Sequence, residues 1–197
     1  MIVQHLPIIQ IILPLMCAPL CLLIRHPRLV WIWATLTSVL CLPISIFLLR
    51  QVLSEGTIIY ALGGWAAPWG IEYRIDTLNA FILVIVTLIG AIVMPYARRS
   101  VELEIPGDRI YLFYTMLLLC EAGLLGIAIT GDAFNLFVFL EISSLSSYVL
   151  ISLGKDRRAL TAAYRYLITG VILSPPKRTF STGNYSSEYL NSRRARV

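Results

Sequence analysis

The sequence has few charged residues. Asp, Glu, Lys and Arg make up only 14% of its 197 residues, whereas hydrophobic residues make up 58%. A soluble globular domain carries about 25% charged residues, so this composition excludes an ordinary soluble fold. Several apolar runs exceed the roughly 18 residues that are typical of a transmembrane helix. The sequence therefore predicts a polytopic membrane protein.

The chain is also poor in residues that bind metals or carry redox chemistry. It has two histidines, His5 and His26, and four cysteines without a CxxC pair. All four cysteines fall inside apolar runs, where we expect small buried side chains: Cys17, Cys21, Cys41 and Cys120. No nucleophile–base arrangement, glycine-rich phosphate loop or flavin fingerprint occurs. We therefore predict no cofactor, no metal site and no redox residues in this chain.

The excess of positive charge is confined to one end. Of the formal net charge of +5, the stretch from residue 174 onward supplies +4, with five basic residues and one acid. The remaining body is nearly neutral and mostly apolar. A basic face for nucleic acid is therefore not predicted, and the expected surroundings are a lipid bilayer.

Five apolar segments are long enough to cross a bilayer, at about 6–24, 29–53, 75–97, 110–130 and 131–154. Between the second and third, "TIIYAL" and "GIEYRI" alternate in polarity and predict a short hairpin outside the membrane. A sixth apolar stretch begins at Ala159 but has only about 14 residues, short of the roughly 20 needed to span. The predicted fold class is an all-α polytopic membrane protein with five transmembrane helices and an incomplete sixth.

The apolar pattern breaks at residue 173 and divides the chain. Residues 1–172 form the predicted transmembrane helical region. Residues 173–197, "LSPPKRTFSTGNYSSEYLNSRRARV", have no apolar period and end in basic residues. We expect this polar basic tail to be disordered or to derive from a frameshift near codon 173, because a natural stop there would leave a half-inserted helix.

Loop charges predict the orientation. The loops after spans one, three and five hold eight basic residues, whereas those after spans two and four hold only Arg50 and Arg74. The eight are Arg25, Arg28, Arg98, Arg99, Arg109, Lys155, Arg157 and Arg158. The positive-inside rule places these loops in the cytoplasm and the N-terminus outside. We expect an integral protein of a bacterial inner membrane.

The fifth span contains a carboxyl group. Glu141 lies about 13 Å along the helix from Asp132, near half of a ~30 Å hydrocarbon core. A charged side chain there costs about 2.5–3.5 kcal/mol or more, and intramembrane acids commonly mark ion paths. Four nearby serines predict close packing in a bundle, with Glu141 facing a wet interior. Proton transfer by Glu141 is the favoured interpretation, and a neutral glutamate that only supports packing is the alternative.

Three further residues are candidates for secondary roles. Glu121 is a mid-span acid that suits either a proton relay or a hydrogen bond to a neighbouring helix. Asp132 suits an N-terminal helix residue better than a conductor, and Asp76 is interpreted in the same way. Arg165 lies two turns inside the incomplete sixth helix, where it either reaches the cytoplasmic edge or contributes to a charge path.

Several stretches, in order along the chain, resemble one membrane protein family. They are "GGWAAPWGIEYRID", "LNAF", "DRIYLFYTMLLLCEAGLLGI", "TGDAFNLFVFLEISSLSSYVLISLG" and "ALTAAYRYLITG". Over about residues 6–172 the chain resembles proton-conducting antiporter-type subunits, most closely the D-type subunit of multisubunit (Mrp-type) cation/proton antiporters. The related subunits of respiratory complex I are the runner-up.

The resemblance implies a role for Glu141. The matching glutamate in the family is a proton-pathway residue that works with a lysine on a later membrane helix. That lysine has no counterpart here, because the chain departs from the family after Ile172. Near Glu121 the family usually has an apolar residue, so the resemblance implies no role for it.

The sequence leaves two classes of function open. The first is a membrane subunit of a cation/proton antiporter, truncated and inactive alone, that carries protons and in some cases sodium together with other membrane subunits. Membership of NADH:quinone oxidoreductase (complex I) is its variant, in which this chain would be part of an enzyme. The second is a truncated, non-conducting membrane scaffold.

Overall fold

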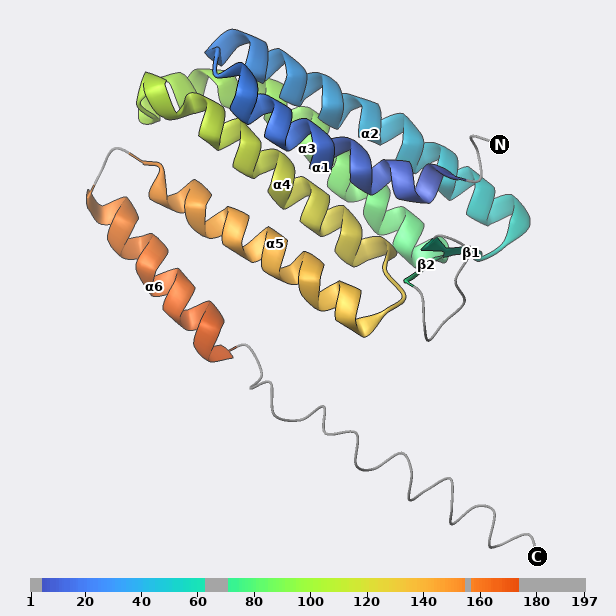
Figure 1. The fold of residues 1–197 in the computed structure, drawn as a ribbon. Helices are drawn as coiled ribbons and strands as arrows, with labels where there is room; N and C mark the ends of the chain where they lie inside the picture. The colour runs from blue at the N-terminus through green and yellow to red at the C-terminus, as the bar shows by residue number, and fades with distance from the viewer. Residues whose placement is uncertain (1–4, 63–70, 155–156, 174–197) are drawn as a thin grey trace, which may run out of the picture.

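The computed structural model describes residues 5–62, 71–154 and 157–173, with the side chains of 157–159 and 171–173 left aside. The predicted tail after residue 173 and the basic residue Lys155 lie outside this part of the chain. Within it the chain forms six α-helices and a two-stranded sheet (Figure 1). The helices are α1 (Leu6–Ile24), α2 (Pro27–Glu55), α3 (Thr77–Glu104), α4 (Ile110–Ile129), α5 (Ala133–Ser152) and α6 (Arg157–Leu173).

Five helices are long and apolar enough to span a membrane, which confirms the predicted all-α polytopic fold. Four of them are α1, α2, α3 and α5. The remaining span, Gly107–Ile129, consists of the short 3-10 turn η3 (Gly107–Arg109) followed directly by α4. The protein is therefore an integral membrane protein. α6 has 17 residues, or roughly 25 Å at 1.5 Å per residue, which is less than the ~30 Å hydrocarbon core.

Local sequence signals begin and end the helices. Asp76 and Asp132 precede α3 and α5, and each side chain accepts hydrogen bonds from backbone N–H groups of the first turn. Such caps satisfy donors that have no partner within the helix. α1 ends at Arg25 in the left-handed conformation (φ 50°), and Pro27 then begins α2. Prolines have no N–H to lose at a helix start.

The helices form a bundle with an added layer. α1 contacts α2 and α4, α3 also contacts α2 and α4, and these four make the bundle. α5 packs along α4, and α6 lies outside α5 (Figure 1). The interior of the bundle contains two apolar clusters, one around Leu48, Ile75 and Ile129 and the other around Met94 and Tyr114.

A polar group of three side chains crosses the bundle among these apolar residues. Gln10 of α1 donates to Ser45 Oγ of α2 at 2.9 Å, and Ser45 Oγ lies 2.9 Å from Thr87 Oγ1 of α3. Ser45 and Thr87 also bond to carbonyl oxygens in their own helices. Hydrogen bonds between small polar residues are a common means of fixing membrane helices against each other.

The predicted hairpin is confirmed. β1 (Ile58–Ala61) pairs antiparallel with β2 (Glu72–Ile75), with Tyr60 opposite Tyr73. A bridge between Tyr73 and Thr130 adds the α4–α5 connection to the edge of β2. The backbone N–H of Gly131 donates to the Glu72 carbonyl at 3.0 Å. The hairpin therefore joins the α2–α3 connection to the α4–α5 connection.

The expectation that α5 is buried within a bundle is wrong for the described residues. Only 17% of its apolar window is buried, compared with 50% for the span containing α4. It packs mainly against α4 and α6, so a large part of its surface is uncovered, including Phe134, Phe137 and Leu145. Of the four serines that led to the expectation, Ser143 and Ser147 face Cys120 of α4, whereas the hydroxyls of Ser144 and Ser146 bond to carbonyl oxygens of α5 itself.

Candidate proton-transfer site

Glu141 lies near the middle of α5, as its position in the sequence predicts. Its side chain is half-buried. Two neighbours on the same helical face, Phe137 and Leu145, are 41% and 52% exposed. The carboxyl group thus borders the uncovered side of α5 rather than the bundle interior.

α5 reaches α4 through small residues. A Cβ atom on Gly123 would come within 2.9 Å of the Ser143 backbone nitrogen, and one on Gly126 would overlap the Phe139 ring. These glycines are therefore required for the two helices to pack at this separation. Cys120 Sγ lies 3.5 Å from the hydroxyl of Ser147 in the same contact.

Glu121 is buried inside the bundle on α4. Its residue is 6% exposed, and Ser38 Oγ of α2 donates to its Oε1 at 2.9 Å. Its Oε2 is buried and has no hydrogen-bond partner among the described residues. An unsatisfied buried polar atom is costly, so this carboxyl group is a candidate for chemistry rather than for packing alone.

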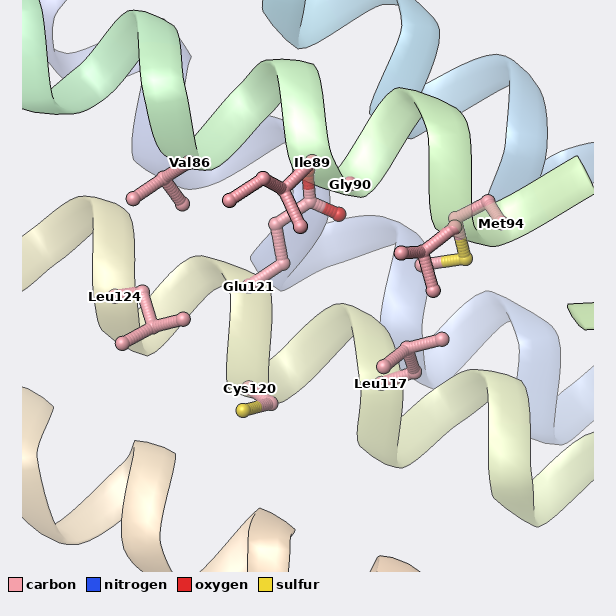
Figure 2. Close-up of a pocket in the computed structure, with 9 residues that line it drawn as sticks. Val86, Ile89, Gly90, Met94, Leu117, Cys120, Glu121 and Leu124 are labelled. Carbon is pink, nitrogen blue, oxygen red and sulfur yellow. The ribbon is translucent and has the colours of Figure 1, made fainter. Parts of the chain in front are cut away.

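A glycine on α3 makes room for this carboxyl group. A Cβ atom on Gly90 would lie 2.5 Å from Glu121 Oε1 and 2.7 Å from Ser38 Oγ. Figure 2 shows the Glu121 side chain extending from α4 toward Gly90, while Cys120 points away from it on the other side of α4. Three helices thus define the position of one carboxyl group.

A cavity of about 120 Å³ borders Glu121 between α3 and α4 (Figure 2). Apart from Glu121 and Cys120, its walls are apolar and include Val86, Met94 and Leu117. Other lining residues are exposed at the bundle surface, namely Ile89, Val93 and Leu124. The cavity is therefore an apolar crevice that leads from the surface of the bundle to the acid.

The two acids both lie in the middle part of adjacent helices, about one helical turn apart, because Gly123 packs against Ser143 and Cys120 lies beside Ser147. Glu121 is nine residues before Thr130, and Glu141 is nine residues after Asp132, which is about 13 Å along each helix axis. Their environments differ, because Glu121 contacts α2 and α3 whereas Glu141 borders the open side of α5. The fold places them on adjacent helices without joining them in one hydrogen-bonded cluster of described residues.

The other candidates lie apart from these acids. Asp132 caps α5, where its carboxylate accepts from the backbone N–H groups of Phe134 and Asn135 at 3.4 and 3.3 Å. Arg165 is exposed on α6. No group of three or more His, Cys, Asp or Glu residues that could hold a metal ion occurs in the described part of the chain.

Comparison with known proteins places this geometry in a family. No protein-family model matches the chain. It is 40% identical over 172 residues to the N-type subunit of NADH-quinone oxidoreductase from Desulforudis audaxviator, which covers 84% of this chain and 33% of that protein. It is 31% identical over 172 residues to the D-type subunit of the Na(+)/H(+) antiporter from Alkalihalophilus pseudofirmus, covering 87% and 34%. The chain spans about one third of the length of these curated relatives.

The fold is also similar to that of chains in solved membrane complexes. One is an archaeal membrane-bound sulfane sulfur reductase complex, a respiratory membrane complex, with a TM-score of 0.74, 29% identity, and coverage of 85% of this chain and 34% of that one. The Mrp complex from Dietzia sp. has the same fold, with a TM-score of 0.75 at 20% identity, covering 87% and 32%. The chain is homologous to antiporter-type membrane subunits. It matches the N-terminal part of these subunits, as the resemblance indicated.

Two residues of the Glu121 environment were not found from the sequence. Ser38 and Gly90 are single small residues inside apolar runs, and nothing in their spacing points to an acid on another helix. A weak signal does exist, because Ser38, Cys41 and Ser45 fall on one face of α2 and all are buried. That face would have indicated that α2 is polar where it meets the interior of this antiporter-type subunit.

Proposed function

We propose that this chain forms part of a membrane subunit of a multisubunit monovalent cation/proton antiporter, in which Glu141 contributes to a proton-translocation path. The observation that carries the proposal is the combination of antiporter-type homology over 172 residues with an acid near the middle of α5. An intramembrane acid is expensive to maintain and commonly serves an ion path.

The half-exposed position of Glu141 suits this role. Its side chain is half-buried and borders the uncovered face of α5, next to the exposed Phe137 and Leu145. In the assembled protein that face is available to further helices, which would supply the groups that exchange a proton with Glu141. Transport therefore requires parts of the subunit beyond the third that this chain matches, and we expect no transport from this chain alone.

The proposal extends to the partners and the location of the chain. The proposed partners are other membrane subunits, and the proposed cargo is protons, with sodium as the exchanged ion. We place the protein in a bacterial inner membrane with the N-terminus outside and the basic loops after α1, α3 and α5 in the cytoplasm. The hairpin would then lie on the outer side.

The alternative within this class is complex I membership. The observation that supports this alternative is the 40% identity to the N-type subunit of an NADH-quinone oxidoreductase, compared with 31% identity to a D-type antiporter subunit. In that case the chain would contribute to proton pumping without redox residues of its own. A non-conducting membrane scaffold remains the proposal of the other class, and a scaffold would not depend on the acid.

The test is a graft. Residues 1–172 replace the matching N-terminal third of a D-type antiporter subunit, and the assembled complex is placed in proteoliposomes with an internal pH dye and an imposed sodium gradient. Glu141→Gln removes the titratable group but keeps the shape, so proton flux should fall about 100-fold or more. Glu141→Asp should keep part of the flux, and Glu104→Gln, at the exposed end of α3, serves as the matched control.

The outcomes separate the proposals. Normal flux in a correctly assembled Glu141→Gln complex would leave Glu141 a packing residue and favour the scaffold. The same graft in an N-type subunit of complex I, with quinone-dependent proton pumping as the measurement, identifies the complex in which residues 1–172 function. Glu141-dependent flux from the 197-residue chain alone would contradict the expectation that this chain needs further helices.

A further inference from the structure

We propose that Glu121 is a second proton-binding site, held as a neutral carboxylic acid at the floor of the α3–α4 crevice. It is distinct from Glu141 and has no role in the family resemblance. Any part it plays in transport rests on the proposed function. The binding of the proton does not, and the experiment below measures only that binding.

The first step of the argument is the hydrogen bonding. One oxygen of Glu121 accepts from Ser38, and the other is buried with no donor among the described residues. An ionised carboxylate can accept several hydrogen bonds, so one donor leaves most of its accepting capacity unused. A neutral acid also leaves this oxygen without a partner, but an uncharged hydroxyl is far less costly to bury than a charged oxygen.

The second step is the surrounding charge. The groups that face Glu121 from the helices packed against it carry no positive charge. They are Ser38 and the Cys41 thiol from α2, and Gly90 and Met94 from α3. Cys17 of α1 lies next in this set, close enough to influence Cys41. A buried carboxylate without a paired cation is strongly disfavoured, so proton binding neutralises the site.

The third step identifies the ligand as a proton rather than a metal cation. A sodium ion needs several oxygen ligands to replace its hydration shell. The crevice offers the carboxyl group and the Ser38 hydroxyl, and its other walls are Val86, Ile89, Met94 and similar side chains. Only a proton requires no further ligands.

The fourth step is access. The crevice has room for a small molecule, at about 120 Å³, and its rim includes the exposed side chains of Ile89, Val93 and Leu124. An apolar reagent dissolved in the bilayer can therefore approach Glu121 from the α3–α4 face, whereas a charged one is excluded by the apolar walls.

The position of Gly90 provides a way to disturb this site selectively. A methyl group at Gly90 would occupy the space of the Glu121 Oε1 and Ser38 Oγ atoms, at 2.5 and 2.7 Å. Gly90→Ala should therefore separate the carboxyl group from Ser38 without removing either. Gly107→Ala is the matched control, since nothing lies within 4 Å of the added atom.

The experiment uses the 197-residue chain in lipid vesicles. Infrared spectra in H₂O and D₂O should show the C=O band of a protonated carboxylic acid near neutral pH, with the expected isotope shift. The band should disappear in Glu121→Gln and persist in Glu141→Gln. Ser38→Ala and Gly90→Ala should move its frequency, which a merely structural role would not do.

A second measurement covers the case in which Glu121→Gln does not fold. The native chain is treated with an apolar carbodiimide, which reacts with protonated carboxyl groups, and the labelled residue is found by mass spectrometry. We expect labelling at Glu121, and little from a charged, water-soluble carbodiimide. Absence of both the infrared band and the label would overturn the proposal. Loss of the band on adding sodium at constant pH would also overturn it, because the carboxylate would then bind a cation.

Discussion

Glu121 and Glu141 both lie in the middle part of adjacent helices, yet their surroundings have little in common. Glu121 is enclosed by α2, α3 and α4, each of which contributes an atom or a space to its position. Glu141 lies on a helix that contacts the bundle along one side and leaves the rest of its surface uncovered. The bundle of α1 to α4 by itself supplies the surroundings of Glu121, whereas the function of Glu141 depends on what covers α5.

The largest expected effect comes from disturbing the contact between α4 of the bundle and α5. Gly126→Val would place a branched side chain against the Phe139 ring, which already occupies the position of an added Cβ atom. We expect the free energy of unfolding to fall by about 2–3 kcal/mol, the upper part of the range for overpacking. A chemical denaturation series in detergent measures this, with Gly107→Val as control because its surroundings are open.

The same variant tests whether α5 separates as a unit. Cys120 Sγ lies 3.5 Å from Ser147 Oγ, so Ser147→Cys should form a disulfide with Cys120. Gly126→Val should lower the yield of that disulfide while the contacts between α2 and α3 persist. An unchanged yield would show that α4 and α5 tolerate the larger residue, so that their contact does not depend on glycine at position 126.

A smaller effect is expected when the Glu121 site loses its donor. Ser38→Ala leaves both oxygens of a buried carboxyl group without a partner among the described residues. This should lower the free energy of unfolding by about 1–2 kcal/mol. Ser144→Ala is the matched control, since that hydroxyl bonds to backbone carbonyls of its own helix on α5. Equal losses in the two variants would contradict the contrast between the bundle interior and α5.

The smallest effect concerns the helix starts. Asp132→Ala and Asp76→Ala each remove a cap that accepts from first-turn N–H groups. Each change should cost about 1 kcal/mol. Because α5 has fewer neighbours than α3, loss of the Asp132 cap should increase hydrogen exchange over the first turn of α5 more than loss of Asp76 does for α3. The reverse order would indicate that α5 is the better supported helix.

The helices and the hairpin could be predicted from the sequence, but the contacts between them could not. The apolar runs predicted the five spans, with the first from Leu6 to Ile24 as observed, because membrane helices need length and hydrophobicity. Alternation predicted the hairpin between α2 and α3. Both signals are local, so each can be recognised without knowing the neighbours in space.

The packing of the acids depended on information that is not local. Whether Glu121 meets Ser38 is determined by the rotation of α2 and α4 about their axes, which hydrophobic runs do not specify. For α5 the sequence predicted more burial than the structure shows. Its serines indicated close packing with a helix, but they did not indicate how many helices pack against α5. The role of a glycine such as Gly90 could not be predicted from the sequence either, because it consists in leaving space for atoms of other helices.

The hairpin has a consequence for the biosynthesis of the protein. Tyr73 emerges from the ribosome before α3, but its bridge partner Thr130 emerges only after α4. Until α3 and α4 have both been threaded through the bilayer, this edge of β2 lacks the partner that later closes it, and open strand edges invite pairing with other chains. Formation of the Tyr73–Thr130 bridge therefore marks the moment at which the nascent bundle has received its fourth helix.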